Sequence, residues 1–499
     1  SKADTWLPIK PGTDLAFYLA LIHVIVTEEL YDRDFVERYT VGFDEVAEAV
    51  KETTPEWAER ETEIPAGRIR EIAREFAYYA PRSFIYKGRR TSWTTNDTEM
   101  RQAMAIANAL IGNWDRPGGI FPKDRIRTGE VELDVWPPLP DQDCVVPMSD
   151  KHPLANAGDG AYLDFREKVL RDDPYPVRGF VVYKQNPMHS LPDRARTRAM
   201  IEKMEFVAVI DIFPTDTAWL ADVILPEDTY LERNDPVVGF QEPYPFLALR
   251  KPVVERLHDT RANLEIMQGL SKRLGFPEFF DFDIEAMQRA QLEPFDLHPD
   301  DMVATGVWTD RAGEREYEKT LREGYRFRTP SGKIEIASER MRRRGYDPVP
   351  RYEPPETIPR GQFRLLVGKN AYFTHAFNQN NPWLHELMPE NRVWIHPGPA
   401  RDRGIADGDT VRIKSPVGEV VMRAWVTERI RPDCVHVPHG FDHQSPGRSR
   451  VHGVGGCDAD LLISREDKIS GNAALHEALV SGARVAGGSV VRSCSASAS

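Results

Sequence analysis

The chain has 499 residues, which is enough for about three domains. Hydrophobic residues make up 41% and charged residues 29%, a composition that argues against a disordered or a membrane protein. The net charge of −13 argues against a general binder of nucleic acid or of anionic membranes. No apolar run approaches about 18 residues, so the sequence predicts no transmembrane helix of the usual length.

The ends and the cysteines give two further expectations. The sequence starts without Met, basic leader or signal peptide, and it ends in a Ser/Gly-rich stretch without periodicity. We therefore expect part of a longer protein, with a disordered tail over 481–499. The cysteines are isolated in sequence and form no CxxC pair: Cys144, Cys434, Cys457 and Cys494. Neither a disulfide framework nor a tetrathiolate zinc or iron–sulfur site is predicted within the chain.

Residues 1–120 are expected to form part of an α/β cofactor-binding domain. Apolar residues at helical spacing predict three helices, over 14–30, 66–79 and 98–112. Thr13 and Asp14 are able to cap the first of them. The segment 83–88 (SFIYKG) reads as a strand, and a Pro followed by two Gly ends the third helix.

Residues 121–345 are expected to form a second α/β domain with insertions, which starts with a weakly periodic, Pro-, Asp- and Gly-rich excursion over 121–178. Two apolar runs, 179–187 and 206–217, each break into a polar loop that leads into helical spacing. Strand, loop, helix and strand in this order are typical of a parallel sheet. The sequence from 255 to 345 is mostly helical in pattern and heavily charged.

The ends of these two predicted strands are candidates for a binding edge, because ligands of parallel α/β sheets bind at the carboxyl ends of strands. The polar residues found there are Lys184, Gln185, Asn186, Asp211, Thr215 and Thr217. Ordinary polar loops remain the alternative. A GxGxxG fingerprint is absent, so a standard nicotinamide site has no support.

A Pro-rich linker over 346–361 separates these regions from a domain at 362–480. Its short strands at close spacing predict a compact β-barrel. Pro416, Val417 and Gly418 lie between two apolar runs and predict a hairpin turn.

Histidines concentrate in this domain, where six of the thirteen fall between His375 and His443. His436, His439 and His443 follow each other at intervals of three and four, which raises the possibility of a zinc site. Pro438 and Gly440 interrupt any helix there. Histidines that contact solvent or hydrogen-bond a ligand are the favoured interpretation.

Two other clusters have a possible binding role. Four amide side chains at 378–381, preceded by His375, suit a purine edge, a ribose or a pterin, although a capped turn explains them equally well. Arg89 and Arg90 follow the predicted strand at 83–88 and could bind an oxyanion, with a solvated pair as the alternative. No Ser/His/Asp or Cys/His arrangement stands out. The residues alone predict an α/β protein with a β-barrel that binds a large, polar, anionic cofactor.

A series of motifs resembles the catalytic subunit of molybdopterin oxidoreductases of the dimethyl-sulfoxide-reductase family. In chain order they are ADTWLPIKPGTD, GRRTSW with GNWDRPGG, YKQNPMHSLPD, VIDIFPTDTAWLADVILPEDTYLE, TPSGKIEIAS, NNPWLHELMPEN, RGIADGDTVRIKSPVGEV and ISGNAALHE. They cover roughly residues 1–480. Within the family, the chain is most similar to polysulfide, thiosulfate and tetrathionate reductases. Respiratory arsenate reductases and formate dehydrogenases are less similar.

The resemblance implies two molybdopterin guanine dinucleotides around one molybdenum, in a cleft between α/β domains capped by a six-stranded type of barrel. Contacts with a guanine end are implied for Gly12, Thr13 and Asp14. Contacts with nucleotide or pyrophosphate are implied for Gln185, Asn186, Pro187, Asp211, Thr215 and Thr217. In the barrel, the implied pterin or nucleotide contacts are Gly368, His375, Asn381 and Asn472. Arg89 or Arg90 would face the substrate near molybdenum and steady a developing anion.

The resemblance also shows what this sequence lacks. The family's iron–sulfur cysteine motif and its molybdenum ligand both precede residue 1, so an iron–sulfur cluster is expected only in a missing N-terminal region. None of the four cysteines is assigned as a metal ligand. A chain of this extent is expected to be incomplete and, by itself, inactive.

The function implied is a two-electron reduction of a sulfur compound: polysulfide, thiosulfate or tetrathionate. Reduction of arsenate, selenate or nitrate, or oxidation of formate, is the alternative within the family. A non-catalytic cofactor-binding fragment or pseudoenzyme is the alternative outside it, while a hydrolase or transferase lacks the GxSxG or Walker motif. The implied partners are an iron–sulfur electron-transfer subunit, a membrane anchor and a small-molecule substrate, with no nucleic acid. The implied location is periplasmic, after twin-arginine export.

Overall fold

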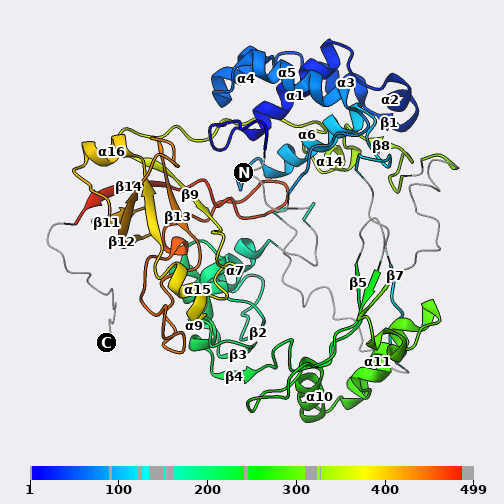
Figure 1. Cartoon of the computed structure of the whole chain (residues 1–499), viewed down its shortest axis with the longest axis vertical. Helices are drawn as coiled ribbons and strands as arrows, with labels where there is room; N and C mark the ends of the chain where they lie inside the picture. Colours follow the sequence, from blue (N-terminus) through cyan, green and yellow to red (C-terminus); the bar gives the residue numbers. More distant parts are fainter. Residues whose placement is uncertain are drawn as a thin grey trace.

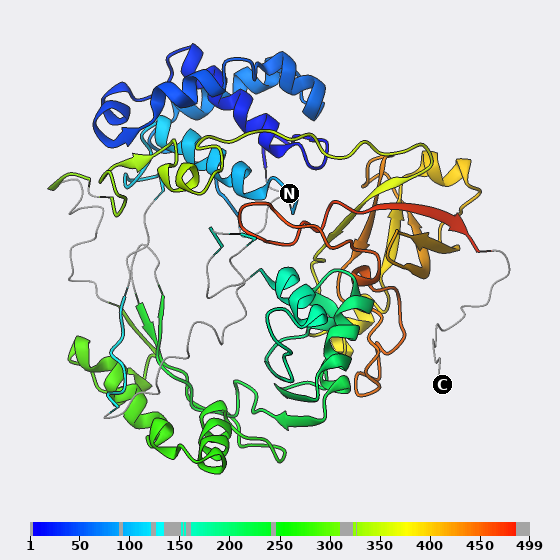
Figure 2. The same ribbon diagram turned by 180° about the vertical axis from the view of Figure 1, so that it is seen from behind.

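The fold is known from a computed structural model of the chain. The structure describes residues 3–88, 93–120, 126–133, 151–152, 154–155, 161–240, 246–309, 323–325 and 327–485. Four units are visible in Figure 1: a helical unit at the top, a barrel at the left, a parallel sheet below the barrel, and a small antiparallel sheet with helices at the lower right. Figure 2 shows the same four units from behind. No helix among the described residues combines the length and the apolar character needed to cross a membrane.

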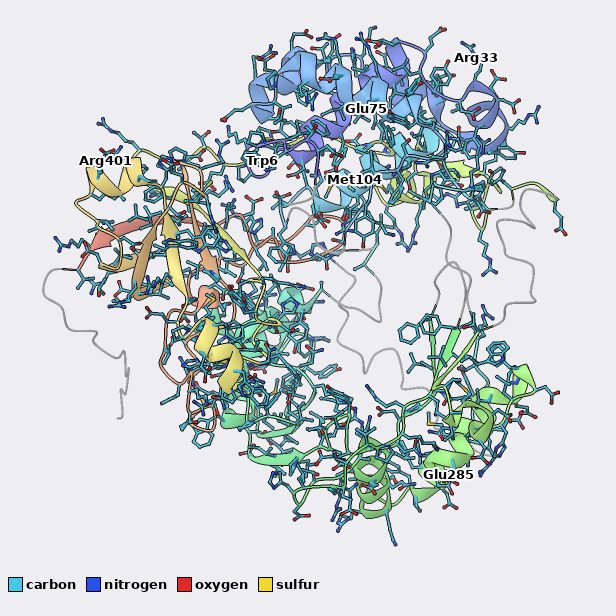
Figure 3. The ribbon with its side chains drawn as sticks, in the orientation of Figure 1. Trp6, Arg33, Glu75, Met104, Glu285 and Arg401 are labelled. Carbon is cyan, nitrogen blue, oxygen red and sulfur yellow. The ribbon has the colours of Figure 1, made fainter. Side chains whose placement is uncertain are left out.

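The helical unit is built around one apolar helix. Its helices are α1 (Asp14–Thr27), α2 (Arg33–Tyr39), α3 (Phe43–Ala49), α4 (Pro55–Thr62), α5 (Ala66–Tyr78) and α6 (Asp97–Leu110). Helix α1 is apolar on nearly every side and is buried among α4, α5 and α6, which accounts for its composition. Figure 3 shows Met104 of α6 within this unit, where its side chain is 1% exposed, and Arg33 at its outer surface. The three helices predicted from apolar spacing are confirmed.

Two predictions for this unit are wrong in detail. The Thr13 hydroxyl does not cap α1, because it donates instead to the carbonyl of Lys10 at 2.6 Å. The segment 83–88 is extended but is not a strand, because the Asn108 side chain takes the place of a neighbouring strand. Its amide oxygen accepts from the N–H of Ile85 at 2.9 Å, and its amide nitrogen donates to the carbonyl of the same residue at 3.2 Å.

The described part of 1–120 is therefore helical rather than α/β. Its one strand, β1 (Thr40–Val41), pairs in parallel with β8 (Ile334–Glu335). Because β8 follows the antiparallel sheet in sequence, the chain returns to the helical unit before the barrel begins. Helix α14 (Glu339–Arg343) lies beside it, and residues 347–361 then run to the barrel without helix or strand (Figure 1).

The parallel sheet contains β2 (Gly179–Tyr183), β3 (Phe206–Asp211) and β4 (Val223–Pro226), in the order β2-β3-β4. Helices α7 (Tyr162–Arg171), α8 (Pro187–Ser190) and α9 (Arg194–Lys203) pack with it around a core that includes Val182, Val207, Val209, Met200 and Ile201. The two predicted parallel strands are confirmed. Helix α7 falls in the region expected to be a weakly periodic excursion and corrects that expectation over 162–171.

The antiparallel unit contains β5 (Val238–Phe240), β6 (Phe246–Ala248) and β7 (Val307–Thr309). Helices α10 (Asn263–Leu274), α11 (Ile284–Leu292) and α12 (Pro299–Val303) surround it, together with short 3₁₀ turns at 277–280 and 293–295. The side chain of Asp283 caps α11, and the side chain of Glu265 caps α10 through the N–H of Ala262. The expected charged helices from 255 onward are thus present, although β7 interrupts them.

The C-terminal unit is a closed barrel of six strands, as expected. Its strands are β9 (Phe363–Gly368), β10 (Arg392–Ile395), β11 (Thr410–Lys414), β12 (Glu419–Val426), β13 (Cys434–Pro438) and β14 (Leu479–Arg484), in the order β10-β12-β11-β14-β9-β13. Short helices α15 (Pro382–Leu387) and α16 (Pro397–Asp402) lie between strands. The predicted hairpin joins β11 to β12 through a 2.9 Å bond from the N–H of Ser415 to the carbonyl of Gly418. A disordered tail was expected from residue 481. That boundary is too early, because β14 continues to Arg484.

The long connection from β13 to β14 ties the barrel to the helical unit. Asp467, which is 1% exposed, accepts from the N–H of Thr98 at 3.0 Å and from its hydroxyl at 2.8 Å. It also accepts from two backbone N–H groups of its own turn, those of Ile469 and Ser470. One carboxylate therefore satisfies buried donors on both sides of the contact between α6 and the barrel.

Replacing Asp467 with alanine is expected to lower the free energy of unfolding by about 2–4 kcal/mol, because several buried donors lose their acceptor at once. Urea denaturation followed by tryptophan fluorescence measures the change. Asp402→Ala, which removes an exposed acid at the end of α16, is the matched control and should change it by less than about 0.5 kcal/mol. Equal effects of the two substitutions would contradict a joining role for Asp467.

Candidate functional site

A pocket of about 560 Å³ lies between the carboxyl ends of β2 and β3 and the edge of the barrel. The sheet contributes Gln185, Asn186, Asp211 and Thr215 to its lining, and the barrel side contributes Gly368 and His375. All six were predicted as cofactor contacts, and the structure brings them together from segments almost two hundred residues apart. The pocket thus lies at the strand ends where a parallel sheet binds its ligands.

Other predicted residues lie elsewhere. Pro187 begins α8, and Thr217 lies behind Asn186 rather than in the pocket lining. The side chain of Asn381 caps α15 by accepting from the N–H groups of Trp383 and Leu384, which is the capped-turn alternative for the amide cluster. Asn472 is exposed on the β13–β14 connection.

The predicted guanine contacts lie away from the pocket, and the predicted catalytic residues are not described by the structure. Gly12, Thr13 and Asp14 lie at the start of α1 in the helical unit, where Gly12 packs against Pro355. Burial raises the pKa of Asp14 above its ordinary value. Arg89 and Arg90 lie outside the described residues, so their assignment to the substrate stays a prediction.

The Asn186 amide is fixed by its neighbours. Its oxygen accepts from the hydroxyl of Thr217 at 2.8 Å and from the N–H of the same residue at 3.2 Å. Its nitrogen donates to Oδ2 of Asp216 at 3.3 Å. With the oxygen occupied twice, Asn186 can offer a ligand only its second amide hydrogen.

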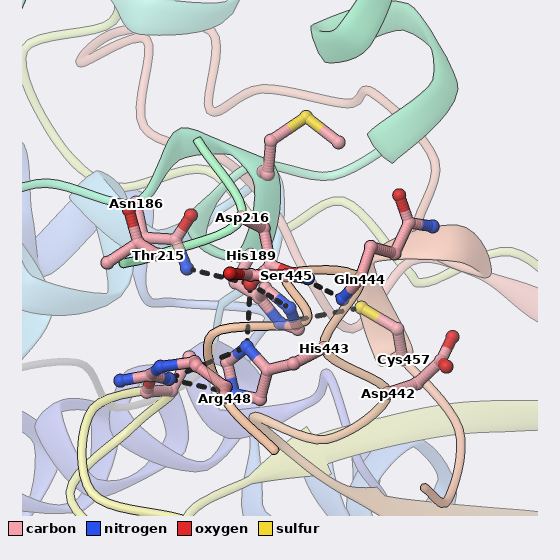
Figure 4. Close-up of polar contacts among 12 residues, drawn as sticks. Asn186, His189, Thr215, Asp216, Asp442, His443, Gln444, Ser445, Arg448 and Cys457 are labelled. Atoms are coloured by element: carbon pink, nitrogen blue, oxygen red, sulfur yellow. Dashed lines mark hydrogen bonds and ion pairs between the residues drawn. The ribbon is translucent and has the colours of Figure 1, made fainter. Parts of the chain in front are cut away.

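Asp216 is the centre of a buried polar network that joins the sheet to the barrel (Figure 4). Its Oδ1 accepts from the backbone N–H groups of Gln444 and Ser445, and its Oδ2 accepts from Nδ1 of His443 at 2.6 Å. Nε2 of His189 lies 3.1 Å from the same oxygen, without the geometry of a well-directed hydrogen bond. Burial alone would raise the pKa of Asp216, but His189 and His443 hold it far below its ordinary range.

The proton positions in this network follow from its geometry. An NH2 group of Arg448 lies 3.0 Å from Nε2 of His443, and a guanidinium can only donate. Nε2 of His443 must therefore be the acceptor, and Nδ1 carries the hydrogen that is donated to Asp216. Burial and the neighbouring His189 lower the pKa of His443 to about 3, which agrees with a neutral ring of this tautomer.

Stability is expected to fall with acid because of His443. An unfolded histidine titrates near pH 6.5, and the folded value is about 3, so below about pH 6.5 the unfolded chain binds a proton that the folded chain does not. The free energy of unfolding should then fall by up to about 1.4 kcal/mol per pH unit between these values. Urea unfolding at several pH values between 7 and 5 should show a shallower slope for His443→Gln. The exposed His258→Gln should keep the slope of the parent, and an unchanged slope in both variants would refute the assignment.

His189, Asp216 and His443 are close enough together to suggest a metal site. The surroundings do not favour one. A metal-bound histidine normally donates its other N–H to an acceptor, whereas the other nitrogen of His443 accepts from Arg448. Nδ1 of His443 carries the proton and cannot bind a cation in that form. The carboxylate of Asp216 already accepts from several donors.

Two cations, Lys184 and Arg233, line the pocket on the sheet side and are held by a buried acid. Glu227, which is 2% exposed, accepts from Lys184 at 3.0 Å and from Arg233 at 2.9 Å, and the Tyr183 hydroxyl donates to it at 3.1 Å. Lys184 and Arg233 both line the pocket and share Glu227, and Arg233 is also paired with Asp235 at 2.7 Å.

On the barrel side, a buried carboxylate holds one pocket histidine. Nδ1 of His439 lies 2.8 Å from Asp458, which is 1% exposed, and the His439 ring packs edge-on against His375. His436 belongs to β13 and packs against Trp394, and burial lowers its pKa to about 4. The three histidines considered for zinc, His436, His439 and His443, thus have separate partners.

The described cysteines are not exposed to the pocket. Cys457 is fully buried with its sulfur 3.6 Å from Nδ1 of His189, and Cys434 is buried on β13. Burial raises the pKa of both thiols, that of Cys434 to about 12. Cys144 and Cys494 lie outside the described residues.

Sequence reasoning missed Asp216, His189 and Arg448. Asp216 stands between two residues that were predicted, Thr215 and Thr217, and its position at a strand end was the available signal. His443 was noticed only as part of a zinc pattern. Its true partner is 227 residues away, and no spacing rule connects the two.

The structure places a pocket between the strand ends of a parallel sheet and the edge of a closed barrel. A family model described as "Molybdopterin oxidoreductase" matches residues 1–273, and one described as "Molydopterin dinucleotide binding domain" matches residues 363–479. The chain belongs to the molybdopterin oxidoreductase family. The resemblance read from its motifs is thereby confirmed, and dimethyl sulfoxide reductases are among the relatives.

Individual relatives match most of the chain. It is 32% identical to the thiosulfate reductase molybdopterin-containing subunit PhsA of Salmonella typhimurium, over 91% of this chain and 65% of the relative. It is 30% identical to the probable oxidoreductase YoaE of Bacillus subtilis, over 90% and 64%. The acetylene hydratase structure from Pelobacter acetylenicus shares the fold, with a TM-score of 0.82 and 22% identity over 97% of this chain and 72% of that one. The chain spans about two thirds of the length of these curated relatives.

Proposed function

We propose that the protein is the greater part of a molybdenum oxidoreductase that holds two molybdopterin guanine dinucleotides and reduces a sulfur compound by two electrons. Polysulfide, thiosulfate and tetrathionate are the proposed substrates. The observation that carries the proposal is the pocket between the ends of β2 and β3 and the barrel, in a chain whose barrel matches a dinucleotide-binding family model. The similarity to a thiosulfate reductase subunit supports the substrate class.

The pocket residues fit a large, polar, anionic cofactor. Gln185 and the second amide hydrogen of Asn186 can bond to ring or sugar oxygens, and Asp211 can accept from a ring N–H. Burial raises the pKa of Asp211, and it remains an acceptor for the N–H of Phe213 at 2.9 Å. The buried Nε of Arg448 has no partner among the described residues and provides a donor for an anionic group. When bound, the cofactor supplies two-electron chemistry at molybdenum, while this chain binds and orients it.

The remaining parts of the proposal concern the whole enzyme. An iron–sulfur cluster in an N-terminal region would deliver electrons, and Arg89 or Arg90 would face the substrate. An iron–sulfur subunit and a membrane anchor are the proposed partners, and the periplasm is the proposed location. The Salmonella relative is named as a molybdopterin-containing subunit, which supports a multi-subunit enzyme.

The test is the enzyme isolated from its native source with its complete polypeptide. Its molybdenum and guanine nucleotide contents should approach one and two per chain, the ratio that the proposal requires. Oxidation of a reduced viologen should then be faster with thiosulfate, tetrathionate or polysulfide than with arsenate, selenate or nitrate. Faster turnover of an oxyanion of the second group, of formate, or hydration of acetylene would replace the substrate assignment. Absence of molybdenum and guanine nucleotide from the folded native protein would refute the proposal.

A further inference from the structure

Arg448 is a buried cation that borders the pocket and has an unused donor. Its side chain is 1% exposed. One NH2 group donates to the carbonyl of Ala376 at 2.7 Å, and the other donates to the carbonyl of Phe377 at 2.5 Å. The guanidinium lies over the ring of Phe213, 5.2 Å from its centre. Nε is buried and has no hydrogen-bond partner in the part of the chain that the structure describes.

The surroundings of Arg448 do not neutralise its charge locally. No carboxylate of the described residues lies within ion-pair distance of it. Its polar contacts are two carbonyls and the neutral ring of His443, and Asp211 and Asp216 act on it only over longer distances. A buried charge without an adjacent counter-charge is costly, and a bound anion would remove that cost.

Three other arginines of the described residues are buried, and each has a carboxylate within ion-pair distance; that of Arg364 is Glu477, at 3.5 Å. Arg166, which is fully buried, donates to the carbonyl of Pro192, to the hydroxyls of Thr197 and Ser464, and through its Nε toward Glu167. Arg194 binds two aspartates, with its Nε donating to Asp460 at 2.8 Å. In both, Nε is used within the protein. The contacts of these two arginines within the protein account for their burial, so both have a structural role. Arg448 differs because its side chain lines the pocket and its Nε–H is unused.

We propose that Arg448 is the anion anchor of the pocket and binds an oxyanion group of the phosphate or sulfur-oxyanion class through its Nε–H. The inference rests on the proposed function and deepens it, because it assigns one residue to the charged part of the ligand. The Nε–H of a guanidinium can donate a charge-assisted hydrogen bond to an oxygen of such a group, and a guanidinium is more weakly hydrated than an ammonium. The anion can be the pyrophosphate of the dinucleotide or a sulfur-oxyanion substrate.

A consequence is that anion binding and the segment before α15 are coupled. Arg448 is tied to the carbonyls of Ala376 and Phe377, which both line the pocket next to His375. On its other side it is tied to His443 and, through it, to Asp216. The anion would therefore fix the barrel loop and the sheet loop through one side chain; the contacts from Arg448 through His443 to Asp216 are visible in Figure 4.

The test measures anion binding to the cofactor-free full chain, produced in a host that cannot synthesise molybdopterin. Isothermal titration calorimetry is carried out with three probes: inorganic pyrophosphate, guanosine 5′-diphosphate and thiosulfate. Arg448→Met removes the charge at nearly constant length, and Arg450→Met, in an exposed residue of the same segment, is the matched control. Arg448→Met should weaken the anchored probe about 10- to 100-fold, while Arg450→Met should change it less than about twofold.

The probes distinguish the source of the anion. Weaker binding of pyrophosphate and the diphosphate alone assigns Arg448 to the cofactor, and weaker binding of thiosulfate alone assigns it to the substrate. Unchanged binding of all three by a folded Arg448→Met variant, or no binding of any probe by the parent, overturns the proposal. Should Arg448→Met not fold, Arg448→Lys, which keeps the charge and lacks the Nε–H, replaces it with the same criteria.

The outcome is separable from that of the proposed function. Suppose that the native protein contains neither molybdenum nor guanine nucleotide, but that binding of pyrophosphate depends on Arg448. This result would refute the reductase function and retain Arg448 as the anion anchor. Suppose instead that the native protein contains molybdenum and guanine nucleotide, but that probe binding does not depend on Arg448. This result would retain the reductase function and refute Arg448 as the anion anchor.

Discussion

Replacing Asp216 with alanine is expected to lower the free energy of unfolding by about 3–5 kcal/mol. The carboxylate is 2% exposed and accepts from the N–H groups of Gln444 and Ser445, from His443 and from Asn186. Alanine leaves all these buried donors without an acceptor and leaves His189 beside an empty space. Because the donors come from both the sheet and the barrel, the pocket between them should also lose its geometry.

Urea denaturation measures this effect, and Asp222→Ala is its matched control. Asp222 belongs to the same connection, is exposed, and accepts one bond from the N–H of Val207 at 2.7 Å, so its loss should cost about 1 kcal/mol. Asp216→Asn keeps the shape and part of the acceptor capacity and should fall between the two. A loss for Asp216→Ala no greater than that for Asp222→Ala would show that the network contributes little.

Gly440→Ala is expected to destabilise the barrel by about 3 kcal/mol and to abolish ligand binding in the pocket. Gly440 has a φ of +96°, and a Cβ at this position would lie 2.4 Å from the carbonyl oxygen of His375 and 2.4 Å from Nε2 of Gln379. The added methyl group must therefore displace the backbone of a pocket-lining residue. Thermal unfolding and calorimetric titration with guanosine 5′-diphosphate measure the two effects.

The control for Gly440→Ala separates backbone strain from steric overlap. Gly408 has a φ of +79°, and nothing lies within 4 Å of the position of its Cβ. Gly408→Ala should therefore cost only the strain of the left-handed conformation, about 1 kcal/mol, and leave ligand binding unchanged. Equal losses in the two variants would mean that the close approach of Gly440 to His375 has no role.

Much of the fold could be predicted because local signals and final structure agree. Helix α1 carries its apolar residues in an uninterrupted run, and β3 carries an apolar run bounded by polar loops. The segment 83–88 shows where such reasoning fails. Its composition suits a strand, but a ladder also needs a neighbour, and here the side chain of Asn108 takes that place from 23 residues away.

The site was predictable to the extent that it follows from topology. Gln185 and Asp211 could be placed at one edge because parallel strands end on the same side. The partners of Asp216 could not be found in this way, because a hydrogen bond between a sheet loop and a barrel loop leaves no periodic trace in either segment. Burial decides the state of His443, and burial is a property of the assembled units rather than of the local sequence.

The strand order of the barrel has a consequence for biosynthesis. Strand β9 is the first of the barrel to leave the ribosome and β14 is the last, yet the two are neighbours, and Leu479 of β14 pairs with Arg364 of β9. The barrel therefore cannot close on a nascent chain until β14 has been made. The sheet wall of the pocket, which extends to Arg233, must wait for a barrel wall whose first strand begins at Phe363, about 130 residues later. Insertion of a ligand between the two walls is thus confined to the time after β14 has been synthesised, and a chain released before β14 would display the sheet wall without a closed barrel beside it.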